Sequence, residues 1–353
     1  MKNLKIFLAL FATAFYAEIG FAQTGKFAFS QLSLPPSAHV AALGGANISL
    51  HDGDLSFALQ NPALLSQKMH KNIALNATNY VSDVNFGSVA GAWALSDEHF
   101  VGVGIQFVDY GNFLNTDEYG NTYGDFTARD LAFHLMYAHK ISPHITVGGT
   151  LKPIYSSYQN YNSFALAVDM GANYFVEKSQ LSLGLVLKNI GFQFTGFTTG
   201  DIGDHYRERL PIELQFGVSK RVANAPFRVS ATLRDLQRWD MRYRNDAISG
   251  GSLSGNDTPK GENLGFFDNV IRHVVLGVDF IPSEQFFLTA GYNVRRAAEM
   301  QLQNKRSFAG FSAGGGLKLY KFQLGFAYAQ YHPHIASLSF SIATNLSAWG
   351  KRL

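Results

Sequence analysis

Cysteine is absent from the 353-residue sequence, and charged residues make up only 16 % of it. The lack of cysteine excludes disulfide frameworks, thiol catalysis and cysteine metal sites. A soluble domain usually has about 25 % charged residues, so we expect something other than water to face much of the protein surface. The formal net charge of +3 is too small to indicate nucleic-acid binding by itself.

Long apolar runs are also missing, because none reaches the roughly 20 residues that a membrane-spanning helix needs. The nearest is residues 6–17, which two lysines precede and small residues at positions 20 and 22 follow. This order predicts a signal peptide over residues 1–22, cleaved after Ala22. The alternative, a retained membrane helix, is disfavoured because the run is too short.

An alternation of apolar and polar residues extends from about residue 71 to residue 346. One run places four leucines on one face and small or polar residues on the other: Leu181, Leu183, Leu185 and Leu187 against Ser182, Gly184 and Lys188. This period of two predicts half-apolar strands. About fourteen such runs occur, joined by connectors that are mostly short and long in turn, the long ones being 111–127, 191–208, 237–269 and 295–305. The pattern predicts an all-β fold, a transmembrane up-and-down antiparallel β-barrel of about 14 strands.

The charged residues of these runs share the face that carries glycine and serine. A lysine or arginine that faces lipid at mid-membrane costs about 2–4 kcal/mol, so this face should line the lumen of the barrel. The predicted lumen network is Lys152, Asp169, Lys188, Glu213, Arg228 and Asp279. A soluble sandwich would alternate in the same way, and the low charge, strand number, uneven connectors and signal peptide favour the barrel.

Catalysis has little support in the sequence. The inward acids could form an acid–base set, but pairing with the inward lysines and arginines is the simpler interpretation, and no nucleophile motif frames the serines. We therefore expect no catalytic residues, no metal site and no cofactor.

Residues 23–70 do not follow the strand pattern and are rich in small and turn-forming residues. A barrel of about fourteen strands encloses a lumen that its own side chains do not easily fill. We therefore expect residues 23–70 to form a plug, 71–346 the barrel and 347–353 a periplasmic tail. The residues that mark the plug are Gly44, Gly45, Asn61, Pro62 and Ala63.

Arginines gather in or beside the long connectors. Planar guanidinium groups suit bidentate binding of phosphate or carboxylate, and the outer leaflet of such a membrane carries lipid phosphates. We expect contact with lipopolysaccharide or a partner, the alternative being plain solvation of the loops. The residues are Arg207, Arg209, Arg238, Trp239, Arg242, Arg244, Arg295 and Arg296.

The N-terminal motifs resemble the plug of fatty-acid-transporter-like outer-membrane barrels: Ala42-Leu43-Gly44-Gly45-Ala46, Leu55-Ser56-Phe57 and Asn61-Pro62-Ala63-Leu64-Leu65. Four further stretches are similar to the PorV/PorQ family of the type IX secretion system: Asp117-Glu118-Tyr119-Gly120, Leu151-Lys152-Pro153-Ile154-Tyr155-Ser156-Ser157, Ala225-Pro226-Phe227-Arg228 and Leu236-Gln237-Arg238-Trp239-Asp240. The resemblance extends over nearly all of the expected mature chain.

This resemblance implies a non-enzymatic barrel in the outer membrane of a Gram-negative bacterium. It would anchor a PorZ-like surface protein in the attachment complex that processes cargo and joins it to lipopolysaccharide, with PorU-like and PorV-like members as further partners. The alternative is a fatty-acid-transporter-like channel for hydrophobic small molecules, against which the charged lumen argues mildly.

Overall fold

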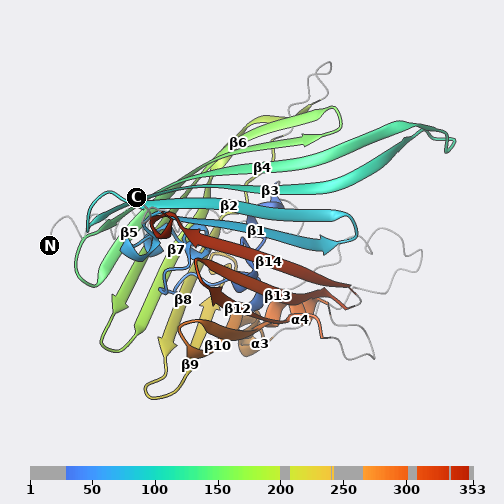
Figure 1. The fold of residues 1–353 in the computed structure, drawn as a ribbon. Coiled ribbons are helices and arrows are strands. Elements are labelled where there is room, and N and C mark those ends of the chain that lie inside the picture. Colours follow the sequence, from blue (N-terminus) through green and yellow to red (C-terminus); the bar gives the residue numbers. More distant parts are fainter. Residues whose placement is uncertain are drawn as a thin grey trace.

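The computed structural model describes residues 29–198, 207–239, 241, 265–300, 308–333 and 335–349. Among them, fourteen antiparallel strands close into one barrel (Figure 1). Each strand pairs with its neighbours in sequence, and β1 pairs with β14 to close the wall. The predicted fold class, an up-and-down barrel of about 14 strands with a plug, is confirmed.

The strands are β1 Asn72–Val81, β2 Val84–Ala94, β3 His99–Thr116, β4 Thr122–Lys140, β5 Ile145–Tyr158, β6 Tyr161–Val176, β7 Leu181–Thr198, β8 Glu213–Arg221, β9 Phe227–Leu233, β10 Val274–Ser283, β11 Phe286–Asn293, β12 Phe311–Leu319, β13 Phe322–His332 and β14 Ile335–Asn345. The helices are η1 Ser30–Ser33, α2 Ala38–Ala42, η2 Leu55–Leu59, η3 Pro62–Leu64, η4 Gln67–Met69, α3 Phe266–Arg272, α4 Val294–Glu299 and η6 Leu346–Ala348.

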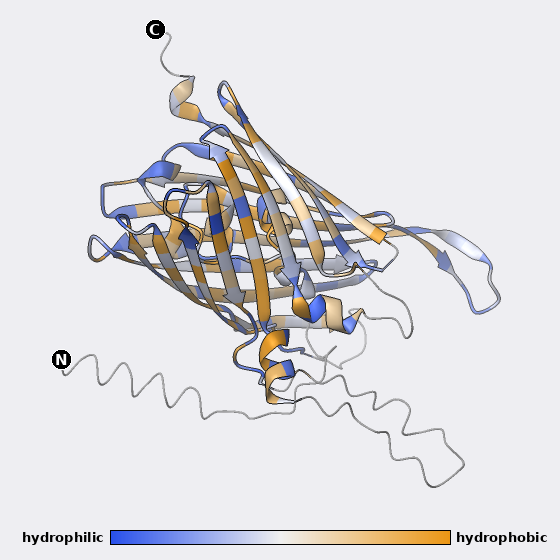
Figure 2. Cartoon of the chain, turned by 90° about the horizontal axis from the view of Figure 1, so that it is seen from below, coloured by the Kyte–Doolittle hydropathy of each residue, from blue (hydrophilic) through white to orange (hydrophobic). Residues whose placement is uncertain are grey.

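The two faces of the wall differ as the sequence predicted. Leu185, Leu276 and Phe340 are exposed on the outside, whereas Lys188 and Asp279 are buried inside. Figure 2 shows the resulting mixture of apolar and polar residues along each strand. A soluble sandwich would bury its apolar face, so this arrangement resolves the ambiguity in favour of a barrel that faces lipid.

Within the part of the chain that the structure describes, no helix has the length and apolar character needed to cross a membrane.

The segment before β1 fills the interior of the barrel. Its helix α2 packs against β11 to β14, and η3 packs against β4, β5 and β6. Leu59 joins Phe100 and Met136 of the wall in one buried apolar cluster. We call residues 29–70 the plug. The expected signal peptide, residues 1–22, lies outside the described residues, as do residues 350–353 of the expected tail.

All four of the predicted long connectors contain regular structure in their described parts, and β7 extends into one of them as far as Thr198. β3 and β4 continue as a paired ribbon as far as Thr116 and Thr122, well beyond the other strands (Figure 1). The aromatic rings of Phe113 and Phe126 stack across this ribbon, with their centres 5.2 Å apart, and support the pairing of β3 with β4. The sequence pattern did not predict this pairing, because the ribbon has many polar residues. Helices α3 and α4 occupy the described ends of the connectors before β10 and after β11.

Candidate functional site

The Asn61-Pro62-Ala63 motif forms the point at which the plug meets β5 and β6. The Asn61 side chain caps η3, because its Oδ1 accepts a hydrogen bond from the backbone N–H of Ala63 (3.0 Å). Its Nδ2 donates to the carbonyl of Ile48 at 2.8 Å. The buried Asn61 therefore joins two plug segments and fixes the motif without needing water.

Two wall glycines make room for this motif. Gly148 and Gly171 face each other across β5 and β6. A Cβ atom on Gly148 would lie 2.7 Å from the carbonyl carbon of Pro62, and one on Gly171 would lie 2.2 Å from Oδ1 of Asn61. The plug backbone thus lies directly against the wall, where any side chain would collide with it.

Gly44 and Gly45 form a second close contact at the end of α2. Both have positive φ angles, of 92° and 93°, which other residues rarely adopt. A Cβ on Gly291 of β11 would lie 2.3 Å from the backbone nitrogen of Gly44. Of the plug residues that the sequence singled out, Gly44, Asn61, Pro62 and Ala63 lie against wall glycines, whereas Gly45 lies near Arg296 of α4.

The first group of lumen charges joins β5, β6 and β7. The Lys152 Nζ lies 2.7 Å from Asp169 Oδ1, and Lys152 also donates a hydrogen bond to Asn189. Lys188 donates to Gln60 of the plug at 3.1 Å. All of these side chains are buried, so this group satisfies its charges and polar atoms within the protein.

Glu213 of β8 continues this group toward the end of the barrel that carries the long connectors. It lies opposite Lys188 in the register of β7 and β8. Arg234 makes a bidentate contact with it, from Nε to Oε1 at 2.7 Å and from Nη2 to Oε2 at 3.1 Å. Long loops of outer-membrane barrels face the exterior and short turns the periplasm, so this end is the exterior mouth.

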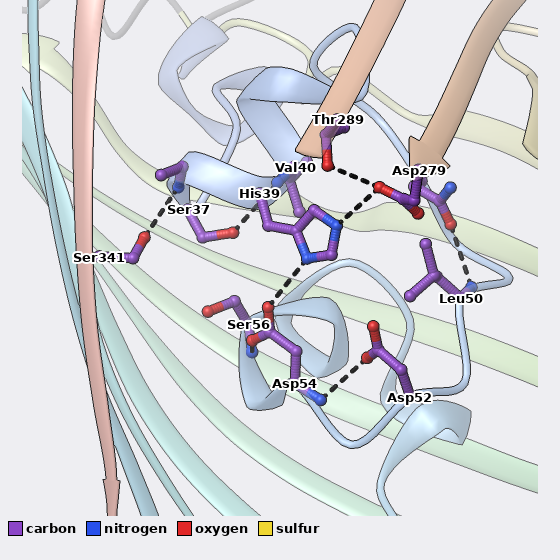
Figure 3. Close-up of polar contacts among 12 residues, drawn as sticks. Ser37, His39, Val40, Leu50, Asp52, Asp54, Ser56, Asp279, Thr289 and Ser341 are labelled. Carbon is purple, nitrogen blue, oxygen red and sulfur yellow. Dashed lines mark hydrogen bonds and ion pairs between the residues drawn. The ribbon is translucent and has the colours of Figure 1, made fainter. Parts of the chain in front are cut away.

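The second group of lumen charges attaches the plug to β9, β10 and β11. Asp279 accepts hydrogen bonds from Arg228 (2.8 Å) and from Thr289 (2.6 Å), its neighbours on the adjacent strands. His39 of α2 lies between this carboxylate, 3.2 Å from its Nε2, and the Asp54 carboxylate, 3.4 Å from its Nδ1 (Figure 3). We call His39, Asp54, Arg228, Asp279 and Asp52, which Arg228 contacts at 3.1 Å, the latch.

Protonated His39 is the centre of the latch. Burial by itself lowers the pKa of a histidine, but the charge of Asp279 and the hydrogen bonds to Asp279 and Asp54 outweigh burial and raise the pKa of His39 to about 9. Burial likewise favours a higher pKa for Asp54, yet His39 holds that pKa below its ordinary value. At neutral pH the plug therefore presents a cation to the wall.

The arginines predicted to contact lipopolysaccharide or a partner lie in different places in the structure. Arg238, Arg295 and Arg296 line a cavity of about 370 Å³ at the exterior mouth. Arg207, Arg209 and Trp239 are exposed. Arg242 and Arg244 lie outside the described residues. Arg295 and Arg296 belong to helix α4, which occupies part of the long connector after β11.

Sequence reasoning missed three features of the interior. His39 gave no signal, because a single histidine among small residues has no motif around it. Asp130 is a buried acid that accepts hydrogen bonds from the hydroxyls of Tyr110 (2.6 Å) and Tyr158 (2.7 Å). The pairing of Gly148 with Gly171 depends on strand register, which the alternation does not provide.

No protein-family model and no curated protein matches the sequence. Among solved structures, the chain is similar to the Pseudomonas putida toluene transporter TodX, with 10 % identity over 91 % of this chain and 99 % of that one and a TM-score of 0.54. It is also similar to the Ralstonia pickettii toluene transporter TbuX, with 12 % identity over 90 % of this chain and all of that one (100 %) and a TM-score of 0.51.

These similarities show the fold. The chain is an integral outer-membrane β-barrel with the same fold as these two toluene transporters. The predicted localisation is confirmed. The narrower assignment to the PorV/PorQ family has no family match and stays a prediction.

Proposed function

We propose that this chain is a plugged outer-membrane barrel that anchors a partner protein at the cell surface. One observation carries the proposal: the plug is fixed to the wall on two sides. Asn61 and Pro62 lie against the glycines of β5 and β6, and His39 is held by Asp279 of β10. A plug attached in this way suits a static role better than transport.

The cavities at both mouths favour the same proposal. The periplasmic cavity, of about 530 Å³, has charged residues such as Asp52, Lys68, Arg221 and Lys318 in its lining. The exterior cavity has five arginines and three acids among its lining residues. A path for hydrophobic molecules is expected to be mostly apolar, and neither of these two cavities is.

The partner class follows from the resemblance to the PorV/PorQ family. The anchored protein would be PorZ-like, PorU-like and PorV-like proteins would assemble with it, and lipopolysaccharide would contact the exterior arginines. The β3–β4 ribbon projects beyond the barrel (Figure 1) and exposes Phe113, Leu114 and Tyr123. We propose that the partner protein binds to this ribbon.

A conduit for hydrophobic small molecules is the second candidate. The fold comparisons favour it over the anchor, because TodX and TbuX are both described as toluene transporters. In this role the plug would have to shift, which means breaking the contacts of His39 and Asp279.

Purification of the tagged full chain from its native membrane in mild detergent, followed by mass spectrometry, distinguishes the two roles. The anchor role predicts recovery of PorZ-like and PorU-like proteins in stoichiometric amounts. The conduit role predicts the barrel alone with bound hydrocarbon or fatty acid, and that result would overturn the anchor.

A ribbon variant sharpens the test. Residues 114–124 are replaced by a short turn beyond the paired residues Asn112 and Thr127, which leaves the membrane wall intact. We expect the partner to be lost while the barrel still shifts its electrophoretic mobility on heating. Substitution of exposed Tyr320, at a turn on the opposite rim, by serine is the matched control and should retain the partner.

A further inference from the structure

The exterior cavity is built by the plug, the wall and the connectors together. Ser30 and Ser33 of the plug, Tyr80 and Tyr331 at the ends of β1 and β13, and Arg296 of α4 contribute to its lining. A Cβ on Gly45 would lie 3.4 Å from the guanidinium of Arg296, so the plug forms the surface beneath this arginine. The cavity is therefore a formed site at the end of the barrel that faces outward.

Its charges do not balance. The lining contains five arginines, Arg234, Arg238, Arg272, Arg295 and Arg296, against the three acids Glu213, Asp235 and Glu299. Arg234 already pairs with Glu213, and Arg295 pairs with both Asp235 and Glu299 at 2.6 Å. Each acid of the cavity therefore already has a cationic partner.

Arg296 is one of the cations that take no part in these pairs. Among the described residues no carboxylate forms an ion pair with it, and its guanidinium lies 4.0 Å from the ring centre of Tyr331. Burial, with Arg234 nearby, lowers the pKa of Arg296. A guanidinium in this setting is a ready site for an oxyanion, which it can bind through two parallel hydrogen bonds.

Two buried polar atoms in the same lining also lack partners. Within the described part of the chain, neither the hydroxyl of Tyr331 nor Nε2 of His273 has a hydrogen-bond partner, although the two residues are only 5 % and 2 % exposed. Buried polar atoms are nearly always satisfied, so their state in this cavity calls for a ligand or solvent.

The hydrogen bonding of His273 indicates which kind of ligand group could bind beside it. The His273 Nδ1 lies 2.7 Å from the carbonyl of Arg234, which only accepts, so Nδ1 carries the proton. With Nδ1 engaged in this way, Nε2 is the ring atom left for a ligand, and a hydroxyl group is a suitable partner for it. The ring of His273 stacks on exposed Trp239 at 5.9 Å, which places an aromatic face beside the cavity.

We propose that this cavity binds an acidic saccharide from outside the cell. Arg296 and the Tyr331 hydroxyl take the phosphate or carboxylate of the sugar, and His273 accepts a hydrogen bond from one of its hydroxyls. The sugar is either soluble or carried by an outer-leaflet glycolipid. Saccharide binding at this site does not depend on whether the chain anchors a protein or conducts hydrophobic molecules. A direct binding measurement therefore tests this proposal separately from the proposed function.

Calorimetric titration of the purified full chain in detergent is the test, with glucose 1-phosphate, inorganic phosphate and uncharged glucose as probes and lipopolysaccharide as the lipid-borne arm. We expect saturable binding of the sugar phosphate that exceeds binding of either phosphate or glucose. Binding of lipopolysaccharide alone would support the site with a lipid-borne ligand. Absence of binding in both arms would overturn the proposal.

Variants assign the binding to the cavity. Arg296→Gln should weaken binding about 10- to 100-fold, the loss expected for hydrogen bonds to a charged group. Tyr331→Phe keeps the ring beneath Arg296, so it should fold normally and weaken binding several-fold. Arg129→Gln removes an exposed arginine of β4 that pairs with Asp109 and should bind as the unaltered chain does. Equal affinity in all three variants would place any binding elsewhere.

Discussion

His39 connects the plug to the wall through a charge that depends on pH. Its ring stacks on Phe287 at 4.4 Å and meets Phe57 edge-on, so packing holds the imidazole between Asp54 and Asp279. Removing one partner of a buried, hydrogen-bonded charge pair leaves the other charge uncompensated, and the usual cost is about 3–5 kcal/mol. His39 is therefore a major contributor to the attachment of α2 to the wall.

Stability should fall as the pH rises through the pKa of His39. That pKa is about 9 in the folded chain against 6.5 ordinarily, so the contribution is complete below about pH 6.5 and lost above pH 9. A shift of this size corresponds to on the order of 3 kcal/mol. Urea unfolding in detergent between pH 6 and pH 10 measures it.

His39→Gln is the comparison for this pH series. Its stability should be lower than that of the unaltered chain at pH 6 and should change less between pH 6 and pH 10. His144→Gln, in an exposed turn, should reproduce the full pH dependence. Parallel curves for the unaltered chain and His39→Gln would contradict the assignment of the charge to His39.

Strand β5 has two adjacent glycines, of which Gly148 lies against the plug and Gly149 does not. Gly148→Ala places a methyl group 2.7 Å from the Pro62 carbonyl carbon, whereas at Gly149 the nearest atom would be 3.7 Å away. Overpacking of this kind costs about 1–3 kcal/mol. We expect Gly148→Ala to lower the free energy of unfolding by that amount and to make the plug accessible to protease.

Gly149→Ala is the matched control, because the chemical change and the strand are the same. Its unfolding curve and its protease resistance should equal those of the unaltered chain. If both alanine variants behaved alike, the tight contact between Gly148 and the plug motif would not exist in solution.

Elements with a clear period could be predicted from the sequence, and those that depend on register could not. The leucines of β7 and the inward charges of β5 to β10 follow from alternation alone. The outer ribbon of β3 and β4 was missed because its residues are polar and turn-forming, and α4 was missed because six residues give too little periodicity.

For the candidate site, the sequence could predict several of the residues but not which of them pair. Turn-rich composition identified Gly44 and Asn61, and parity identified Lys152 and Asp279 as inward. Which charges meet required the register of the barrel: Lys152 with Asp169, and Asp279 with Arg228 and a plug histidine. One predicted network is in fact two groups of charges.

The whole barrel, with its plug in place, should not conduct ions across a membrane. In a planar lipid bilayer the unaltered chain is expected to show no steady conductance, because the plug occupies a lumen that fourteen strands do not fill by themselves. Excision of residues 30–66 should give an ohmic pore. Heat-dependent electrophoretic mobility confirms that the shortened barrel has folded, and a folded but non-conducting shortened barrel would contradict a plugged lumen.

The backbone N–H of Ala38 donates to the Ser341 hydroxyl on β14, at 2.9 Å across 303 positions of sequence. The same strand forms the seam with β1. Strand β14 therefore completes both the wall and the docking of α2. Contacts of such long range slow folding, so the arrival of β14 should be the late step at which an open, exposed sheet becomes a finished, sealed barrel.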